Sequence, residues 1–553
     1  MTWIDILIIA VFFGFTLFAG SLVYRWVGKP DDFYVAGRQL SPFILAATIS
    51  ATNFNIYNYV GYAGQSFAHG ISIVWHEWTG LMGMVTVGLF VQPILRRMRL
   101  VTMPEFLERR YHLSVRLLIS FVWIFRRAFS NGIAIYLCAK VAMILTGYQN
   151  FTFWVVTVGA VAIFYASTGG MWSVVLVNNL QFIFLLGAGL TIFPILLNHV
   201  GWLPGLKAQL PAASFDFVPQ SGPFNWAFIM AIWFLGIQVF CTDQMALQSN
   251  FSARNPKTAV QAWVMAGIIM IPFSFLIVLP GMIGTVTLPA ATDPDSVFPA
   301  LLLQLIPTGV LGIALCGLLA SVLSSVDTSL TAITTLFTVD FYKRLIRPAA
   351  NDRQTLGTAR VTSLVLGVLV VIFAHLVESQ FGTAVNAYLS IIAITDMPLF
   401  VVAILGGLVW RRTTWIGALA AYFFGLAGGL TSQLLGWHIQ GCSFAASTFM
   451  SFGSAIVACV VVSLVTRPPE ASKVAQAMGA RKVGADEIKA GTAYHLMPKH
   501  LFGKLFLGVH TIGLIAYVAG LVLGSIDFAY SDHLAIGGMV VFLVGALFRL
   551  FYD

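Results

Sequence analysis

The feature that most constrains this chain is its series of long apolar segments. Each is close to the length of about 20 residues that a helix needs to cross the hydrocarbon core of a bilayer. The segments are continuous rather than alternating, which excludes a closed barrel. We count about fifteen by hydropathy and expect an all-α integral membrane protein with that number of spans. The predicted spans are 3–24, 44–64, 74–96, 116–145, 152–168, 174–198, 226–246, 259–284, 300–340, 361–377, 385–408, 414–434, 445–465, 505–524 and 535–551.

Composition agrees with this expectation and excludes other protein classes. Of the 553 residues, 59% are hydrophobic and only 9% are charged, against about 25% charged in soluble domains. A surface so poor in charge does not suit a water-soluble enzyme, a disordered scaffold or a nucleic-acid binder. The net charge of +9 reflects basic residues that cluster in alternate loops, which is typical of membrane orientation.

The distribution of Lys and Arg predicts which side each loop faces. With the N-terminus outside, the inner loops hold the basic groups near 25–38, 96–110, 254–257, 343–353 and 411–412, together with the polar linker 466–504. The outer loops hold almost none. We therefore expect a multi-pass protein of the plasma (inner) membrane, with its N-terminus outside and its C-terminus in the cytoplasm. Its partners are then the lipid bilayer, a small-molecule solute and an ion, with no nucleic acid; the oligomeric state is left open.

Two predicted spans are interrupted by polar residues. The second contains three Asn within residues 50–58, and the seventh contains Gln, Thr and Asp within 238–244. Unwound backbone at membrane depth is tolerated where it lines a cavity or faces protein. The two interruptions lie five spans apart, which favours inverted five-helix repeats with a binding site at the breaks. Polar packing between helices is the alternative interpretation.

The ninth segment carries a stripe of small and hydroxylated residues. Gly317, Ser321, Ser324, Ser325 and Thr328 share one face of a helix because of their spacing. Hard cations prefer several oxygen ligands, so adjacent hydroxyls with a carbonyl one turn back indicate a cation site. Close packing between helices explains the same stripe, and spacing alone leaves both interpretations open.

Acidic residues within apolar segments are costly and mark functional sites by default. The candidates are Glu77, Asp243, Asp327 and Asp396. Glu77 lies near the outer start of its span, where a hydrated interfacial residue is the alternative. The sequence contains no phosphate-binding Gly-Lys-Ser/Thr loop and no catalytic Ser or Cys constellation. We therefore expect a transporter driven by an ion gradient rather than an enzyme.

Several motifs together resemble one family of membrane proteins. They are Asp32-Phe-Tyr-Val-Ala-Gly-Arg38, Thr102-Met-Pro-Glu-Phe-Leu-Glu-Arg-Arg-Tyr111, Thr168-Gly-Gly-Met-Trp172, Cys241-Thr-Asp-Gln244, and Ser324-Ser325 followed by Leu336-Phe-Thr-Val-Asp-Phe-Tyr-Lys-Arg344. On these motifs the chain resembles the sodium:solute symporter family from about residue 32 to residue 417. The resemblance implies an inverted five-helix repeat core with alternating access, and extra helices at both ends.

The resemblance also implies a sodium site between the second and ninth spans. Its ligands are carried over as the backbone carbonyls of Ala51, Phe54 and Ser321 and the hydroxyls of Ser324 and Ser325. Sodium is the only cofactor that this implies. For a second cation, or for coupling, the candidates are Asn178, Asp327 and Asp396. Asn178 stands where many members have an acid, so we expect single-ion coupling, with compensation by Asp327 as the alternative.

The substrate residues carry over less completely. The set comprises Asn53, Asn58, Glu77, Trp78, Phe240, Gln244 and Ser390. Asn53, Glu77 and Trp78 match the sugar-transporter pattern, whereas Asn58 and Ser390 replace its His and Gln. The resemblance therefore implies a small polar organic solute that is sugar-like or carboxylate-bearing, and a cationic solute is not excluded.

These expectations combine into a sodium-coupled secondary active symporter with six parts. Residues 1–40 form the extra first span and first cytoplasmic loop, 41–200 and 201–412 the two inverted repeats, 413–465 the peripheral spans, 466–504 the cytoplasmic linker and 505–553 a C-terminal helix pair. The alternatives are a non-transporting membrane sensor or receptor on a transporter fold, a proton-coupled symporter, and a uniporter or leak channel.

Overall fold

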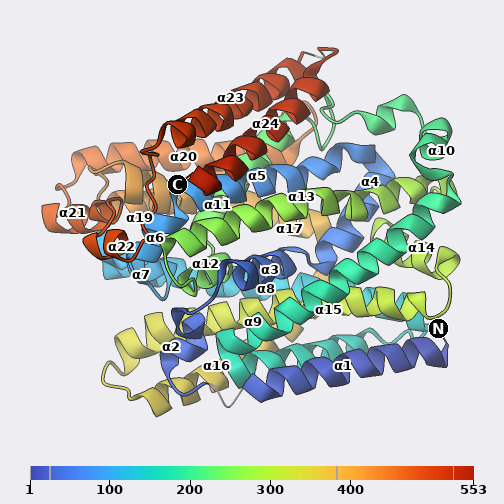
Figure 1. The fold of residues 1–553 in the computed structure, drawn as a ribbon, viewed down its shortest axis with the longest axis horizontal. Helices are drawn as coiled ribbons and strands as arrows, with labels where there is room; N and C mark the ends of the chain where they lie inside the picture. The colour runs from blue at the N-terminus through green and yellow to red at the C-terminus, as the bar shows by residue number, and fades with distance from the viewer. Residues whose placement is uncertain (1, 24–26, 381–383, 527, 553) are drawn as a thin grey trace. The chain divides into compact units, whose positions relative to one another are not determined.

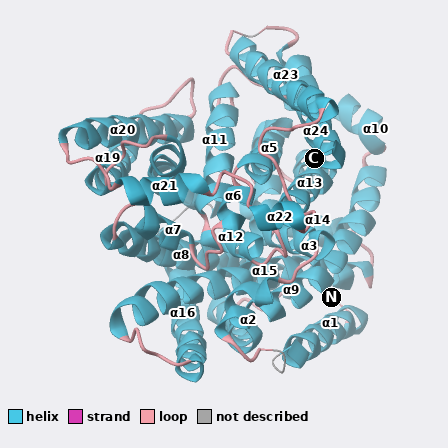
Figure 2. Cartoon of the chain, turned by 60° about the vertical axis from the view of Figure 1, so that its left-hand side comes forward, coloured by secondary structure: helices cyan, strands magenta, loops and turns pink. Residues whose placement is uncertain are grey.

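The computed structural model describes residues 2–23, 27–380, 384–526 and 528–552. Within them the chain is helical, as Figure 2 shows, and an isolated antiparallel β-bridge pairs Ile439 with Cys442. The helices of the first part are α1 (Trp3–Val23), α2 (Pro30–Val35), η2 (Ala36–Arg38), α3 (Pro42–Asn53), η3 (Tyr57–Tyr62), α4 (Ala63–His69), η4 (Gly70–Ile73), α5 (Val74–Phe90), α6 (Gln92–Arg97), α7 (Met103–Arg110), α8 (Leu113–Thr146), α9 (Phe151–His199), α10 (Trp202–Gln209) and η5 (Ala212–Phe215).

The remaining helices complete the chain (Figure 1). They are α11 (Trp226–Thr242), α12 (Gln244–Phe251), α13 (Pro256–Thr287), η6 (Pro294–Ser296), α14 (Val297–Leu305), α15 (Val310–Leu336), η7 (Phe337–Ile346), α16 (Asp352–Gln380), α17 (Ala384–Thr395), α18 (Met397–Phe400), η8 (Val401–Val409), α19 (Trp415–Leu434), α20 (Ser443–Val465), α21 (Ala471–Gly479), α22 (Ala485–Lys489), α23 (Leu501–Gly524) and α24 (Ser531–Tyr552).

The all-helical membrane fold is confirmed, and the predicted segments are helical. Among the described residues, 10 helices are long and apolar enough to cross a membrane, and the pair α11–α12, bent by 51°, adds an eleventh. The other predicted spans correspond to helices that are shorter or interrupted: α1, the series α3–η3–α4, α5 and the first part of α9. The expected number of about fifteen therefore exceeds the number of uninterrupted long apolar helices.

The predicted span 300–340 is wrong at its start. The structure ends one helix, α14, at Leu305 and begins another, α15, at Val310. Between them lies Pro307, which has no backbone N–H to donate, and Gly309, whose φ of 84° is favourable only for glycine. The continuous hydropathy of this stretch concealed a turn.

The helices form two compact units, each assembled from three separate parts of the chain. Unit 1 comprises residues 1–74, 121–216 and 272–388, and unit 2 comprises residues 75–120, 217–271 and 389–553. In unit 1, α15 packs against α9, α1, α3 and α16. A Cβ on Gly317 of α15 would lie 2.5 Å from the Cβ of Ala188 on α9, so a glycine is required for these helices to approach so closely.

The extra first helix is tied to α15 by a carboxylate. Asp5 of α1 is buried and accepts hydrogen bonds from the backbone N–H groups of Gly309 and Gly312, each at 2.9 Å. These groups belong to the amino end of α15, where N–H groups lack intrahelical acceptors. An acid in an apolar helix therefore caps the helix that carries the hydroxyl stripe.

Unit 2 contains a close crossing of α5 and α11 and two C-terminal hairpins, α19–α20 and α23–α24. At the crossing, a Cβ on Gly83 would lie 2.8 Å from the carbonyl carbon of Gly236. The two backbones are thus in direct contact, which small residues permit in membrane helix pairs.

Candidate functional site

The second predicted span breaks at the polar segment. Helix α3 ends at Asn53, and Phe54 follows with an extended backbone (φ −81°, ψ 97°) before the π-helical turn η3 begins at Tyr57. The side-chain amide of Asn53 folds back and donates to the Ile49 carbonyl at 2.7 Å. Asn58 lies in η3 and is buried, with 4% of its surface exposed. This segment belongs wholly to unit 1.

The hydroxyl stripe of α15 faces the broken end of α3. Ser324 Oγ donates to the carbonyl oxygens of Ala51 (3.0 Å) and Ser321 (3.1 Å). Ser325 Oγ donates to those of Thr52 (3.2 Å) and Ser321 (3.0 Å). The structure therefore brings together four of the five predicted sodium ligands, and adds the Thr52 carbonyl, which the sequence did not suggest.

Phe54, the fifth predicted ligand, lies at the break itself. Its side chain is buried and packs edge-on against Phe273, with ring centroids 6.1 Å apart, and close to Tyr59. This packing places the backbone of Phe54 one residue beyond the end of α3.

A buried amide joins three helices beside the stripe. Asn178 Nδ2 on α9 donates to Thr328 Oγ1 on α15 at 2.9 Å and to Thr52 Oγ1 on α3 at 3.1 Å. Thr328 Oγ1 also lies 3.3 Å from Asp327 Oδ1, and both Asp327 and Asn178 are buried. Among the described residues, Asn178 Oδ1 has no hydrogen-bond partner. The network therefore contains one acid and an unpaired acceptor oxygen.

Two buried amides in unit 1 were given no role by the sequence. Gln181 lies one turn from Asn178 on α9 and is 1% exposed, and neither of its amide atoms has a partner within the described part of the chain. Asn131 of α8 is 4% exposed, and its Nδ2 likewise lacks a described partner. The signal that could have found them is an amide in the middle of an apolar span.

The other predicted solute residues lie in unit 2. Glu77 of α5 is 8% exposed, and its Oε1 lies 3.8 Å from Nδ1 of His76. The indole of Trp78 stacks on the Phe217 ring at 5.8 Å, and its Nε1 donates to the Ile271 carbonyl at 3.4 Å. The close contact of Gly83 with α11 follows less than two turns further along α5.

The bent helix pair α11–α12 holds two more predicted residues. The ring of Phe240 packs edge-on against Trp263 at 5.5 Å. Gln244 uses both ends of its amide on the segment before α7: Oε1 accepts from Met103 N, and Nε2 donates to the Val101 carbonyl, each at 2.9 Å. In this arrangement Gln244 supports a neighbouring loop.

The last predicted residues lie near α17. Asp396 is buried between α17 and α18, and Oδ1 accepts a hydrogen bond from the hydroxyl of Thr395 at 2.8 Å. The side chain of Ser390 lies outside the described residues. The predicted sodium ligands therefore lie in unit 1, together with Asn178, Asp327, Asn53 and Asn58, whereas unit 2 contains Glu77, Trp78, Phe240, Gln244 and Asp396.

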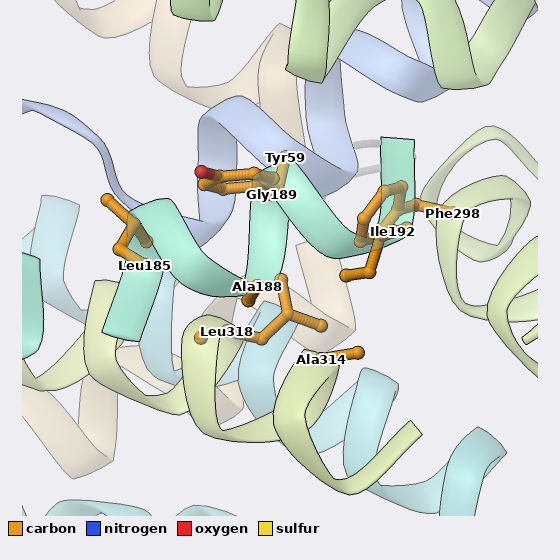
Figure 3. A pocket seen from close by; sticks show the side chains of 9 residues that line it. Tyr59, Leu185, Ala188, Gly189, Ile192, Phe298, Ala314 and Leu318 are labelled. Carbon is orange, nitrogen blue, oxygen red and sulfur yellow. The ribbon is translucent and has the colours of Figure 1, made fainter. Parts of the chain in front are cut away.

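A pocket in unit 1 opens between α9 and α15 (Figure 3). It is lined by Tyr59, Leu185, Ala188, Gly189, Ile192, Phe298, Ala314, Gly317 and Leu318. The only polar side-chain atom of this lining is the Tyr59 hydroxyl, which points away from Phe298 and Ile192 in Figure 3. The lining is too apolar to orient a polar solute.

Comparison with known proteins adds to this geometry. The profile of the sodium:solute symporter family matches residues 33–425. A sodium/glucose cotransporter of Vibrio parahaemolyticus is 25% identical over 76% of this chain and 83% of its own length. The human sodium/myo-inositol cotransporter 2 is 25% identical over 78% of this chain and 69% of its own length.

Two solved structures share the fold. A Na⁺-coupled sialic acid symporter in a substrate-bound outward-open state superposes with a TM-score of 0.74 at 17% identity, over 85% of this chain and 99% of that one. Mhp1, a nucleobase-cation-symport-1 family transporter in a closed conformation, gives a TM-score of 0.55 at 16% identity, over 81% and 98%. These matches confirm the inverted-repeat transporter fold.

Proposed function

The chain belongs to the sodium:solute symporter family, and on that premise we propose that it couples the inward sodium gradient to uptake of a small polar solute. The observation that carries the proposal is the contact of Ser324 and Ser325 with the carbonyls at the broken end of α3. A helix whose last carbonyls face two hydroxyls offers the neutral oxygens that a monovalent hard cation prefers.

In this mechanism sodium takes over the carbonyls as partners, and the two hydroxyls keep their protons and turn their oxygens toward the ion. The ion is held by the carbonyls of Ala51, Phe54 and Ser321 and by the hydroxyls of Ser324 and Ser325. It thereby fixes the end of α3 to α15 and stabilises the outward-open state. The solute then binds at the interrupted segments, and release of sodium to the low-sodium cytoplasm completes the cycle. Coupling follows because each ligand favours the conformation that the other prefers.

The solute set in this proposal is Asn53, Asn58, Glu77, Trp78, Phe240, Gln244 and Ser390. Amides and a carboxylate next to aromatic rings suit a hydroxyl-rich ring, in which hydroxyls both donate and accept. The sodium/glucose and sodium/myo-inositol transporters among the relatives support a sugar-like or polyol solute. A carboxylate-bearing solute is the other class we propose to test.

The N-terminus lies outside and the C-terminus in the cytoplasm.

For stoichiometry we propose one sodium ion per solute. The residue beside the stripe is the neutral amide Asn178, which adds no charge for a second cation. Asp327 supplies a second candidate function, proton coupling, because it is a buried acid next to Thr328. Asp396, a buried acid of unit 2, is a further candidate for coupling.

The test is uptake into proteoliposomes from a mixed pool of sugars, polyols and carboxylates, read by mass spectrometry. An inward sodium gradient is compared with equal potassium and proton gradients. Ser325→Ala should raise the sodium concentration for half-maximal uptake by at least about tenfold. Ser329→Ala is the matched control, because Ser329 is buried on the same helix. Equal accumulation with sodium and potassium would overturn sodium coupling, and accumulation driven by protons alone would favour the role of Asp327.

A further inference from the structure

The polar linker between α20 and α23 makes specific contacts inside unit 2. Its second half, residues 484–496, is called the linker strap here and contains α22. The guanidinium of Arg97, at the end of α6, has its Nε 2.9 Å from Oε1 and 3.1 Å from Oε2 of Glu487. The side chains of Arg97 and Glu487 are 5% and 17% exposed. Arg97 also donates to the Tyr494 carbonyl. A charge-assisted pair so shielded from water holds more strongly than an ordinary surface pair.

A second arginine holds the far end of the linker strap. Arg549 of α24 is fully buried, and its NH2 group donates to the carbonyls of Leu496 at 2.6 Å and His495 at 3.3 Å. Its guanidinium also lies over the rings of Phe90 and Tyr494, at 5.0 Å and 5.5 Å from their centroids. The strap is therefore fixed at two points, by α6 and by α24, and the spacing between them is set by the fold.

Residues 96–103, which the linker strap contacts through Arg97, are also bonded to α12. Arg96, the neighbour of Arg97, donates from Nε to the Ala253 carbonyl at 2.6 Å and from NH2 to the Arg254 carbonyl at 3.2 Å. Gln244, at the start of α12, holds the backbone of Val101 and Met103. Residues 96–103 thus contact the strap, the start of α12 and the residues that directly follow α12. Both views draw α6, α12 and α22 close to one another (Figures 1 and 2).

The contacts from the linker strap through residues 96–103 to α12 matter because of where α12 lies. Helix α12 follows the 51° bend of the broken span. Transporters of this architecture bind their ligands and change conformation at broken helices. If α12 is to move together with the rest of unit 2, it needs bonds to other parts of unit 2. Arg96 and Gln244 bond residues 96–103 to α12 and to the residues that follow it, and Asn250 of α12 donates to the nearby Gln92 carbonyl at 3.3 Å.

We propose that Glu487 is a positioning residue. Through Arg97 and the α6–α7 connection, the linker strap fixes the position of α12 within unit 2. Release of the strap frees residues 96–103, and α12 loses its fixed neighbour. The solute site keeps its residues, so solute affinity is retained while the conformational step slows. The transport part of this inference rests on the proposed function, whereas the structural coupling does not.

The variants isolate one interaction. Glu487→Gln removes the charge, and Glu487→Asp shortens the side chain by one methylene. Asp486→Asn is the matched control, because Asp486 is the exposed acid next to Glu487 on α22. The pair Arg97→Glu with Glu487→Arg restores an ion pair of opposite polarity.

The measurement is hydrogen–deuterium exchange of the full chain in lipid nanodiscs. Glu487→Gln should speed exchange in peptides covering Gln244–Phe251 by roughly threefold to tenfold, the scale of losing one ordinary hydrogen bond. Glu487→Asp should have a smaller effect, Asp486→Asn none, and the swapped pair should reverse the change. Faster exchange confined to residues 484–496, with α12 unchanged, would overturn the proposal.

Uptake kinetics then separate positioning from simple loss of structure. Glu487→Gln should lower the maximal uptake rate roughly threefold at an unchanged half-saturating solute concentration, with recovery in the swapped pair. A change in solute affinity alone would contradict the positioning role. If the wild-type protein transports nothing while exchange in α12 still responds to Glu487→Gln, the proposed function fails and the coupling stands.

Discussion

The amide of Asn178 donates to the hydroxyl of Thr328 across the α9–α15 contact, at 2.9 Å. The same amide reaches Thr52 on α3, so one neutral side chain joins the broken helix, the stripe helix and α9. The Thr328 hydroxyl also contacts the carboxylate of Asp327, and Asn178 Oδ1 has no hydrogen-bond partner in the part of the chain that the structure describes.

Changing Asn178 to Asp should therefore add a coupled charge. A carboxylate at this position, together with Asp327 and the Thr328 hydroxyl, supplies a charged oxygen set for a second cation. The expected result is a rise from about one to about two charges moved per neutral solute, measured as the ratio of current to tracer flux. Asn179→Asp is the control, because its amide is bonded to Ile44, Thr48 and Val175 instead. If the wild-type protein already moves two charges per neutral solute, Asp327 supplies the acid for the second cation.

Gln244→Leu should destabilise the protein more than it weakens solute binding. The substitution removes two hydrogen bonds and leaves the backbone groups of Val101 and Met103 unpaired, at a cost of about 1–3 kcal/mol each where they are buried. The expected result is a lower Tm in lipid nanodiscs, an effect larger than the accompanying loss of solute affinity. A loss of solute affinity at unchanged Tm would show that the bonds to Val101 and Met103 do not stabilise the protein.

Gly170→Ala should be strongly destabilising. Gly170 has φ 55° and ψ −145° at the break inside α9, and an added Cβ would lie 2.6 Å from the Phe33 ring. Backbone strain of this kind costs about 1–3 kcal/mol before the clash is counted. Gly187→Ala is the control on the same helix, where an added Cβ would meet no atom within 4 Å. Equal expression and equal Tm for the two variants would contradict this account.

The loop between α13 and η6 should make stability weakly dependent on acid pH. Burial raises the pKa of Asp293, but the hydrogen bond from the Lys140 ammonium at 2.7 Å outweighs this and holds the pKa below its ordinary value. A depressed carboxyl pKa contributes stability above the unfolded pKa of about 3.9, and that contribution is lost as the pH falls through the folded value. Asp293→Asn should lower Tm slightly at pH 7, with the difference vanishing near pH 3. Asp352→Asn, at the exposed start of α16, is the control.

The sequence predicts the helices well because each apolar run is long and a bilayer leaves helices as the spanning choice. It also predicts that the Ala51 and Ser321 carbonyls lie near Ser324 and Ser325, because helical spacing and the family resemblance agree there, but it does not indicate the Thr52 carbonyl. It misses the turn at Pro307 and Gly309, because hydropathy averages over a short break. It does not show that the Gln244 amide bonds to the backbone of Val101 and Met103, because that segment lies far away in the chain, beyond the reach of any local pattern.

The buried amides show a different limit. Asn131 and Gln181 are each a single polar residue in an apolar run, and such residues commonly serve in helix packing. Only their burial and unpaired amide atoms distinguish them, and both properties depend on neighbours brought together by the fold.

The glycine crossing of α5 and α11 has a mechanical consequence. Gly83 and Gly236 bring the two main chains into contact, and neither residue has a side chain to interlock with the other. Where large side chains of two helices interdigitate, those side chains must change rotamer before the crossing angle of the helices can change. Where Gly83 meets Gly236, a change of crossing angle needs no rotamer change of these two residues, and a methyl group added to either would force the two main chains apart.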